Sequence, residues 1–559
     1  MSKANRTRLG RDGVGRDGWG RRRRWAARGL GAGVAAGLAA LLPMATAEAQ
    51  LLPQMGTPVD LGDLRGAFER AYGPGGVAPG QPSWSVTPGI DVEVRATDNS
   101  RALQGVAGPS RRGRQSELLT IISPSLAIQG TSQRLTGSLF YAPSLRNYMR
   151  DSRQNGIGQN LSATARATIF EDLLFLNASA LASETSRAGG LGQGTGRSIA
   201  RQDQVQTTSF TFGPQLRHAF GDYGAVDLGY TFSHLTRSGQ NLRTNTAFAP
   251  AVNSGSTITN NVQASFTSGQ AFGRINFGLS FQRTDYDGPG VLRNSTRQNS
   301  ILDLGYAATR TLTLLGQAGH QEIRYGGTRP ISISDAIWSL GARWNPDPDT
   351  TMTARFGYRD GGNNFFFEGV TAPTARTRVT ASYSEAMASL ADELQASLGR
   401  GRAAGPAILV DQTTGMPILV NDNFAGAQGG VSRVRRASIS AVLLQDIDTF
   451  SLAFNRDDRI TLSSDVPGAV PGSTFYRGTF SWQRELGPGV RGNVQASYGE
   501  RVAKGGASQD ILTLSAGLNW SLSETLSTRA TYTYTRAGSP QPGFSYDANL
   551  LSLGLRKTF

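Results

Sequence analysis

Apolar and polar side chains alternate along most of the chain, and this alternation constrains the fold more than any other feature. Leu512, Leu514, Ala516 and Leu518, for example, are interleaved with Thr, Ser and Gly. Because successive side chains of a strand point to opposite faces, each such stretch predicts a strand with one apolar and one polar face. The 70 glycines among 559 residues argue against a helical bundle. We therefore expect an all-β protein.

The lengths of the connections separate a soluble sandwich from a transmembrane barrel. Short and long connections alternate, as periplasmic turns and external loops do in outer-membrane barrels. The short ones are 129–133, 171–173, 221–225, 269–273, 345–350, 445–448, 485–489 and 521–525, and the long ones are 97–117, 185–204, 237–256, 385–431 and 457–473. Aromatic residues near strand ends fit the interfacial girdles of such a barrel, namely Phe220, Trp344, Tyr358, Trp482, Tyr498 and Trp520.

The sequence predicts a transmembrane antiparallel up-and-down β-barrel of about 22 strands, with 18 to 24 acceptable, over residues 84–559. The barrel must close, because an open edge in lipid would leave backbone groups without hydrogen bonds. An even strand number places both termini in the periplasm. The last strand carries Leu551, Leu553, Leu555 and Phe559 on one face, with Lys557 breaking the apolar row. It resembles the terminal strand that the barrel assembly machinery recognises, so this machinery and outer-membrane lipid are expected partners.

The N-terminal segment predicts export. Residues 1–28 hold ten Lys or Arg, residues 29–42 are uncharged and largely apolar, and Ala47-Glu48-Ala49 follows. This order is typical of a secretory signal peptide over residues 1–49. These residues contribute seven of the fifteen formal positive charges, so about eight remain. The high pI is therefore weak support for nucleic-acid binding, and we expect none.

Two segments do not fit the strand pattern. Residues 50–83 are rich in Pro and Gly around a short helical pattern and are expected to form a periplasmic lead-in or a small inward segment. At 34 residues, this segment is too short for the globular plug of a TonB-type receptor. The connection 385–431 begins with helix-forming composition over 385–398. It is either a constriction folded into the pore or a capped external hairpin, and we favour the hairpin.

Residues suited to catalysis or metal binding are sparse. The chain has no Cys, and its histidines, His218, His234 and His320, fall on outward faces without metal-ligand spacing. The glycine run 190–196 lacks the Lys-Ser/Thr ending of a phosphate-binding loop. We expect no enzyme, no cofactor and no metal site.

Charge on the polar face is the more informative signal. By strand parity, fourteen arginines face inward against the four carboxylates Asp91, Glu93, Asp227 and Asp303. The pore-lining candidates among these arginines are Arg217, Arg343, Arg355, Arg359, Arg378, Arg491 and Arg529. Such a lumen would concentrate anions and repel cations. The alternative is that several of these arginines lie at strand ends and meet lipid phosphates or turn carbonyls.

Three segments resemble a known family. They are residues 85–90 (SVTPGI), residues 118–148 (LLTIISPSLAIQGTSQRLTGSLFYAPSLRNY) and residues 380–384 (TASYS). They are similar to outer-membrane β-barrel proteins of exopolysaccharide loci and the PEP-CTERM sorting system of Gram-negative bacteria. The resemblance implies the outer membrane of a Gram-negative bacterium and involvement in polysaccharide secretion, and it carries over no site residues.

Taken together, these patterns favour an outer-membrane β-barrel channel or export conduit, with an anionic exopolysaccharide or a secretion component as candidate partner. The rival hypothesis is a non-transporting scaffold whose long external loops bind a polymer or another protein.

Overall fold

The computed structural model describes the strands and most of the connections. It covers residues 83–100, 115–186, 204–239, 255–327, 329–389, 391–393, 401–405, 408–411, 430–465, 472–505, 508–540 and 545–559. All of them belong to the second of two compact units, Ala45–Phe559. The predicted signal peptide, almost all of the 50–83 segment and the glycine run 190–196 lie outside the described residues.

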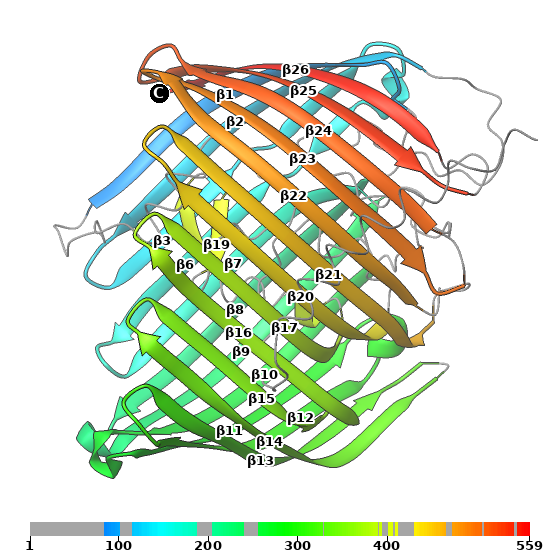
Figure 1. Cartoon of the computed structure of the whole chain (residues 1–559). Coiled ribbons are helices and arrows are strands. Elements are labelled where there is room, and N and C mark those ends of the chain that lie inside the picture. Colours follow the sequence, from blue (N-terminus) through cyan, green and yellow to red (C-terminus); the bar gives the residue numbers. More distant parts are fainter. Residues whose placement is uncertain are drawn as a thin grey trace, which may run out of the picture. The chain divides into compact units, whose positions relative to one another are not determined.

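The described residues form a closed antiparallel barrel of 22 strands, which confirms the predicted fold class (Figure 1). Each strand pairs with its neighbours along the chain, and the last strand pairs with the first. The barrel strands are β1 (Ser83–Thr97), β2 (Glu117–Thr131), β3 (Leu135–Tyr141), β6 (Leu161–Phe170), β7 (Leu174–Ser186), β8 (Gln204–Ala219), β9 (Gly224–Gly239), β10 (Gly255–Ser268), β11 (Ile275–Asp287), β12 (Ser295–Ala307), β13 (Leu312–Tyr325), β14 (Ile331–Asp347), β15 (Thr350–Arg359), β16 (Gly362–Thr374), β17 (Thr377–Ser389), β20 (Gly430–Leu444), β21 (Asp448–Ser464), β22 (Gly472–Gly487), β23 (Val490–Ala503), β24 (Ser508–Ser521), β25 (Leu526–Gly538) and β26 (Tyr546–Thr558).

Four shorter strands complete the list. β4 (Ser144–Tyr148) pairs with β2 beyond the end of β3, and β5 (Gly156–Gly158) pairs with β4, so both extend the barrel wall. β18 (Gly401–Gly405) and β19 (Ile408–Asp411) form a separate two-stranded sheet. The short 3-10 helices are η2 (Ser152–Gln154), η4 (Gly221–Tyr223), η5 (Gln270–Phe272) and η6 (Gly290–Leu292).

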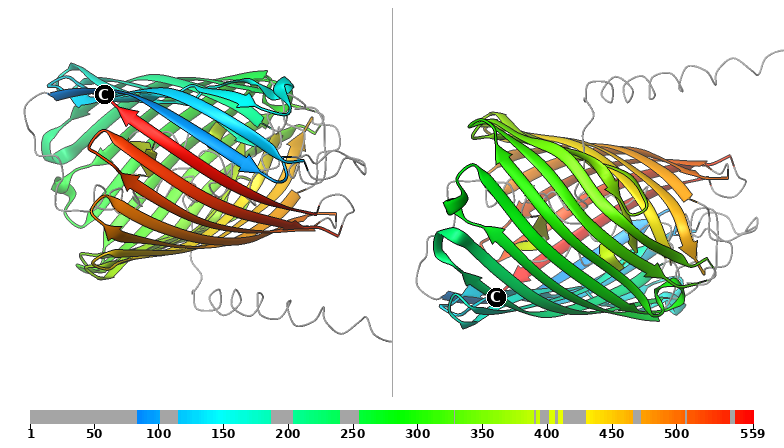
Figure 2. Two further views of the ribbon diagram at one scale, coloured as in Figure 1. Left: turned by 90° about the horizontal axis from the view of Figure 1, so that it is seen from above. Right: turned by 90° about the horizontal axis from the view of Figure 1, so that it is seen from below.

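The two ends of the barrel differ in their connections. We call one the short-turn end, because it carries brief turns such as 348–349, 375–376 and 488–489. The other, the long-connection end, carries 98–116, 187–203 and 390–429. β1 starts and β26 finishes at the short-turn end, where Gly89 pairs with Thr558, and Figure 2 shows the two strands side by side in blue and red. The even strand number therefore returns the chain to the end at which the barrel began.

One turn at the long-connection end has only two residues. Asp360 and Gly361, between β15 and β16, both have positive φ, +56° and +73°. This is the backbone conformation of a tight hairpin turn, for which Asp-Gly is a preferred sequence. Both strands stop early as a result, and β16 pairs with β17 only as far as Tyr383. β20 pairs along the whole of β17, and beyond Tyr383 it is the strand that continues to pair with β17, as far as Ser389.

The wall is apolar outside and polar inside. Leu551, Leu553 and Leu555 are 45%, 53% and 47% exposed, whereas Ser552 between them is 9% exposed. Because a soluble protein buries its large apolar side chains, this inverted pattern indicates an exterior that faces lipid. In the described residues, no helix is long and apolar enough to cross a membrane.

The start of the 385–431 connection differs from the helix expected there. Residues 385–389 continue β17 as a strand, because β20 supplies their backbone hydrogen-bond partners. Residues 391–393 are helical. The remainder of the connection is described only at β18 and β19 and from Gly430 onward.

Candidate functional site

The pore-lining arginines predicted from the sequence occur on strands around the barrel, and most have polar partners. Arg217 lies 3.9 Å from Asp227, Arg355 lies 3.4 Å from Asp303, and Arg491 lies 3.8 Å from Glu485. Arg343 donates a hydrogen bond of 3.4 Å to Thr353. The remaining candidates are Arg359 on β15, Arg378 on β17 and Arg529 on β25. The structure does not gather the seven at one place.

Arg529 lies at the seam of the barrel, the place where the last strand β26 pairs with the first strand β1. Its guanidinium donates to Asp91 at 2.7 Å and to Glu93 at 2.9 Å, both on β1, so it crosses β26. It passes over Gly554, where an added Cβ would lie 2.9 Å from the Arg529 Nε atom. Glu93 also accepts a hydrogen bond of 2.6 Å from Arg95. Arg529 is therefore part of an ion-pair cluster that joins β25 to β1.

A row of amide side chains lines the lumen on the opposite wall. Gln263, Gln282, Asn299 and Gln321 pair in succession across β10, β11, β12 and β13. Gln263, Gln282 and Asn299 line a cavity of about 420 Å³ that Arg217 and Arg359 also border. Asn299 is 5% exposed, and its Oδ1 atom has no hydrogen-bond partner. The cavity thus combines guanidinium donors with amide donors and acceptors and with the carboxylate of Asp227.

The long-connection end contains an internal apolar cluster. Met387 of β17 and Val431 of β20 belong to one buried cluster with Tyr286 of β11 and with Ile323 and Tyr325 of β13. β17 and β20 pair with each other, but neither of them is a neighbour of β11 or β13 in the barrel wall. The contact exists because β15 and β16 stop at the Asp360 turn, so that the end of β17 can reach the inner face of β11 and β13.

Asp360 joins this cluster to the wall. Its carboxylate accepts hydrogen bonds of 2.8 Å from Arg297 and 3.0 Å from the backbone N–H of Met387. Arg297 also donates to the carbonyl oxygen of Met387 at 2.8 Å. The end of β17 is therefore fixed at Met387 through both its backbone N–H and its backbone carbonyl.

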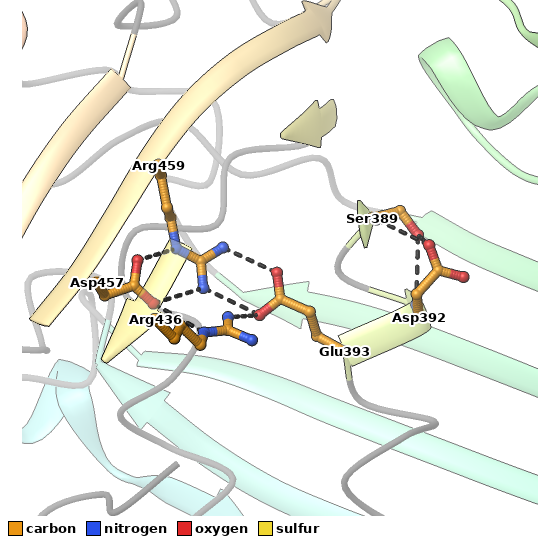
Figure 3. Close-up of polar contacts among 6 residues, drawn as sticks. All are labelled: Ser389, Asp392, Glu393, Arg436, Asp457 and Arg459. Atoms are coloured by element: carbon orange, nitrogen blue, oxygen red, sulfur yellow. Dashed lines mark hydrogen bonds and ion pairs between the residues drawn. The ribbon is translucent and has the colours of Figure 1, made fainter. Parts of the chain in front are cut away.

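A second polar cluster follows directly in the sequence (Figure 3). Glu393 is 3% exposed and accepts two hydrogen bonds of 2.9 Å from Arg459 of β21. It also accepts one from Arg436 of β20. Asp392 accepts hydrogen bonds of 2.8 Å from both the N–H and the hydroxyl of Ser389, and another from the Tyr286 hydroxyl. Residues 391–393 are thus attached to two separate parts of the wall.

The charge state of Glu393 follows from these contacts. Burial acts to raise the pKa of its carboxyl group, but the guanidinium groups of Arg436 and Arg459 outweigh this effect and lower the pKa below its ordinary value. Glu393 is therefore ionised at neutral pH.

The residues of this cluster were not predicted as a site, because the strands that carry its arginines extend further than their sequence pattern indicates. We expected a long connection over 457–473, whereas β21 runs to Ser464, so Arg459 was not assigned to a strand. Arg436, on β20, was not among the predicted pore-lining arginines. Arg436 lies two residues before Ser438 and four before Ser440, which both face inward. Strand parity could therefore have identified Arg436 as an inward-facing side chain. No local signal could have paired either arginine with Glu393.

Among the described residues, the histidines form no site with other ionisable groups. His234 and His320 contact the hydroxyls of Thr236 and Ser334 at 3.5 Å. Within the ranges that the structure describes, no group of three His, Asp or Glu side chains is placed to hold a metal ion.

Comparison with known proteins gives the barrel a broad assignment. Residues 452–559 match the family model of putative beta-barrel porin 2. A search of curated protein sequences finds no match. The similar solved structures include the FrpB iron transporter from Neisseria meningitidis, at 10% identity and a TM-score of 0.49, with 85% of this chain and 82% of that chain covered.

Two further structures belong to the same comparison. The ferric-catecholate import receptor Fiu from E. coli K12 is 11% identical, has a TM-score of 0.44, and is matched over 86% of this chain and 82% of its own. The outer membrane protein opdK from Pseudomonas aeruginosa is 11% identical, has a TM-score of 0.33, and is matched over 85% of this chain and 99% of its own. Together with its lipid-facing exterior, the partial family match makes this chain a porin-like barrel of the outer-membrane type.

Proposed function

We propose that this protein is an outer-membrane conduit of a Gram-negative bacterium for anionic, hydroxylated solutes, with an exopolysaccharide chain as the candidate cargo. The observation that carries the proposal is the chemistry of the lumen. Arginine side chains from β8, β14, β15 and β23 line a wall whose exterior is apolar. Cationic linings raise the local concentration of anions inside a pore.

The row of amide side chains supports the proposal that the transported solutes carry hydroxyl groups. Amide groups both donate and accept hydrogen bonds, as sugar hydroxyls do, so each can replace water around such a solute. Gln263, Gln282 and Asn299 present these groups to the same cavity as Arg217 and Arg359. A solute with hydroxyl and acidic groups would find partners for both there. The proposed partners at the two other surfaces are lipid on the apolar exterior and the barrel assembly machinery at β26.

Ion selectivity in planar bilayers tests the conduit. Arg217, Arg343 and Arg491 suit the test because all three lie toward the short-turn end and none is buried. Replacing the three by Glu should move the reversal potential in a salt gradient from anion toward cation preference. The change should shrink in high salt, because the Debye length falls from about 10 Å at 0.1 M to about 3 Å at 1 M.

Arg153 of η2 provides the control, since its side chain is 86% exposed. The Arg153→Glu variant should keep the wild-type reversal potential. A folded wild-type barrel that does not conduct would overturn the conduit and favour the rival hypothesis of a surface scaffold.

A further inference from the structure

Arg436 and Arg459 are held in place by a shared carboxylate on the barrel wall. Asp457 accepts a hydrogen bond of 3.0 Å from the Nε atom of Arg436 and another of 2.9 Å from the Nε atom of Arg459. Nη2 of Arg459 also lies 3.4 Å from Asp457, and terminal nitrogens of both guanidinium groups donate to one further carboxylate, that of Glu393. The wall itself therefore builds a fork for an anion.

Glu393 occupies this fork. Its two carboxylate oxygens accept from Nη1 and Nη2 of Arg459 at 2.9 Å, which is the bidentate geometry that a guanidinium forms with a carboxylate. Arg436 adds a third hydrogen bond. In Figure 3, Glu393 belongs to a short segment that is not one of the barrel strands. Arg436 belongs to β20, and Asp457 and Arg459 belong to β21.

The wall keeps an excess of positive charge without Glu393. Arg436 and Arg459 carry two positive charges against the one negative charge of Asp457. Arg501 of β23 is near enough to be repelled by the guanidinium group of Arg459 and attracted by the carboxylate of Asp457. Leaving such charges buried without an anion is costly, whereas exchanging one carboxylate for another preserves the pairing.

We propose that Arg436 and Arg459 form a binding site for the carboxylate groups of solutes in the lumen, and that Glu393 is the resident carboxylate that a solute displaces. The inference rests on the proposed conduit function and names the acidic group that the cargo carries. A tethered group competes at an effective concentration of about millimolar. Binding of a solute is therefore weak and reversible, as passage through a channel requires.

Removal of the resident carboxylate tests the exchange. Titration calorimetry on the full-length protein in detergent would use glucuronate as the probe and glucose as the matched neutral sugar. The Glu393→Gln variant should bind glucuronate about tenfold or more tightly than the wild type, because the tethered competitor is gone. Glucose should bind equally to both proteins. Adding Arg459→Gln to Glu393→Gln should weaken glucuronate binding by about tenfold or more, since a charge-assisted hydrogen bond is lost.

A second acidic position controls for the loss of charge alone. Glu171 lies in the short turn after β6 with its side chain 74% exposed, so Glu171→Gln should leave glucuronate binding unchanged. Heat-modifiable gel migration checks that each barrel is folded. If Glu393→Gln does not fold, Glu393→Asp serves instead. Its shorter side chain reaches the fork less well and should give a smaller increase in affinity.

The outcomes separate this inference from the conduit proposal. Equal affinity of the wild type and a folded Glu393→Gln variant for glucuronate would overturn the carboxylate site, and Glu393 would be a fixed brace. That result would leave anion conductance untouched. Tighter glucuronate binding by a variant whose parent does not conduct would support the site and overturn the conduit.

Discussion

At the scale of single residues, the ion pairs of this barrel differ greatly in setting. Arg529 bridges β25 to β1 through Asp91 and Glu93, and all three side chains are mostly buried. The pair of Arg134 and Glu171, in contrast, lies on the surface with both side chains about two-thirds exposed or more. Only the first kind of pair leaves uncompensated charge in the protein interior when one partner is removed.

We expect Arg529→Leu to lower the free energy of unfolding by about 3 kcal/mol, at the lower end of the range for breaking a buried pair, because Arg529 keeps some solvent exposure. Urea unfolding of the barrel in lipid vesicles would measure the change. Arg134→Leu should change stability by less than about 1 kcal/mol. Equal effects of the two variants would show that the cluster at the seam adds nothing beyond a surface pair.

At the scale of elements, residues 391–393 after the end of β17 are attached by groups that titrate. Glu393 faces Arg436 and Arg459 with Asp457 behind them, and Asp392 faces Ser389 and the Tyr286 hydroxyl. Because the pKa of Glu393 is lowered on folding, its ionised form stabilises the fold at neutral pH. This contribution is complete above the ordinary glutamate pKa and is lost as the pH falls through the lowered value.

The stability difference between the wild type and Glu393→Gln should therefore be constant from about pH 8 to pH 5 and shrink below the ordinary glutamate pKa of about 4.3. Thermal unfolding of both proteins across this pH range would measure it. Asp392 is present in both proteins, so its titration cancels in the difference. A difference that grows on acidification would mean that the pKa of Glu393 is raised and that the ion pairs do not form.

At the scale of the whole molecule, the unequal ends of the barrel define an orientation. Outer-membrane barrels have short periplasmic turns and long external loops. We expect a cysteine replacing Arg153, at the long-connection end, to react with a membrane-impermeant maleimide on intact cells. A cysteine replacing Asp222, in the short turn of η4, should react only after the outer membrane is opened. The native chain has no cysteine to interfere. Labelling in the reverse order would invert the orientation while leaving the barrel intact.

The sequence alone determined most strands of the wall, their approximate number and the apolar and polar faces of the wall. The barrel was expected over 84–559, and its first and last strands are found at Ser83–Thr97 and Tyr546–Thr558. Even 364–372, where three consecutive phenylalanines break the alternation, lies in β16. These features are predictable because the side-chain period of a strand is local, and because lipid outside and polar groups inside impose it on every strand.

Only the tertiary structure decided which charges meet. Arg529 and Asp91 are 438 residues apart, and closure of the barrel between β26 and β1 brings them together. Glu393 and Arg459 are 66 residues apart, and they meet because residues 391–393 follow β17, whose partner β20 pairs in turn with β21. Strand parity gives the direction of a side chain but not its partner, because the partner depends on register and closure around the whole barrel.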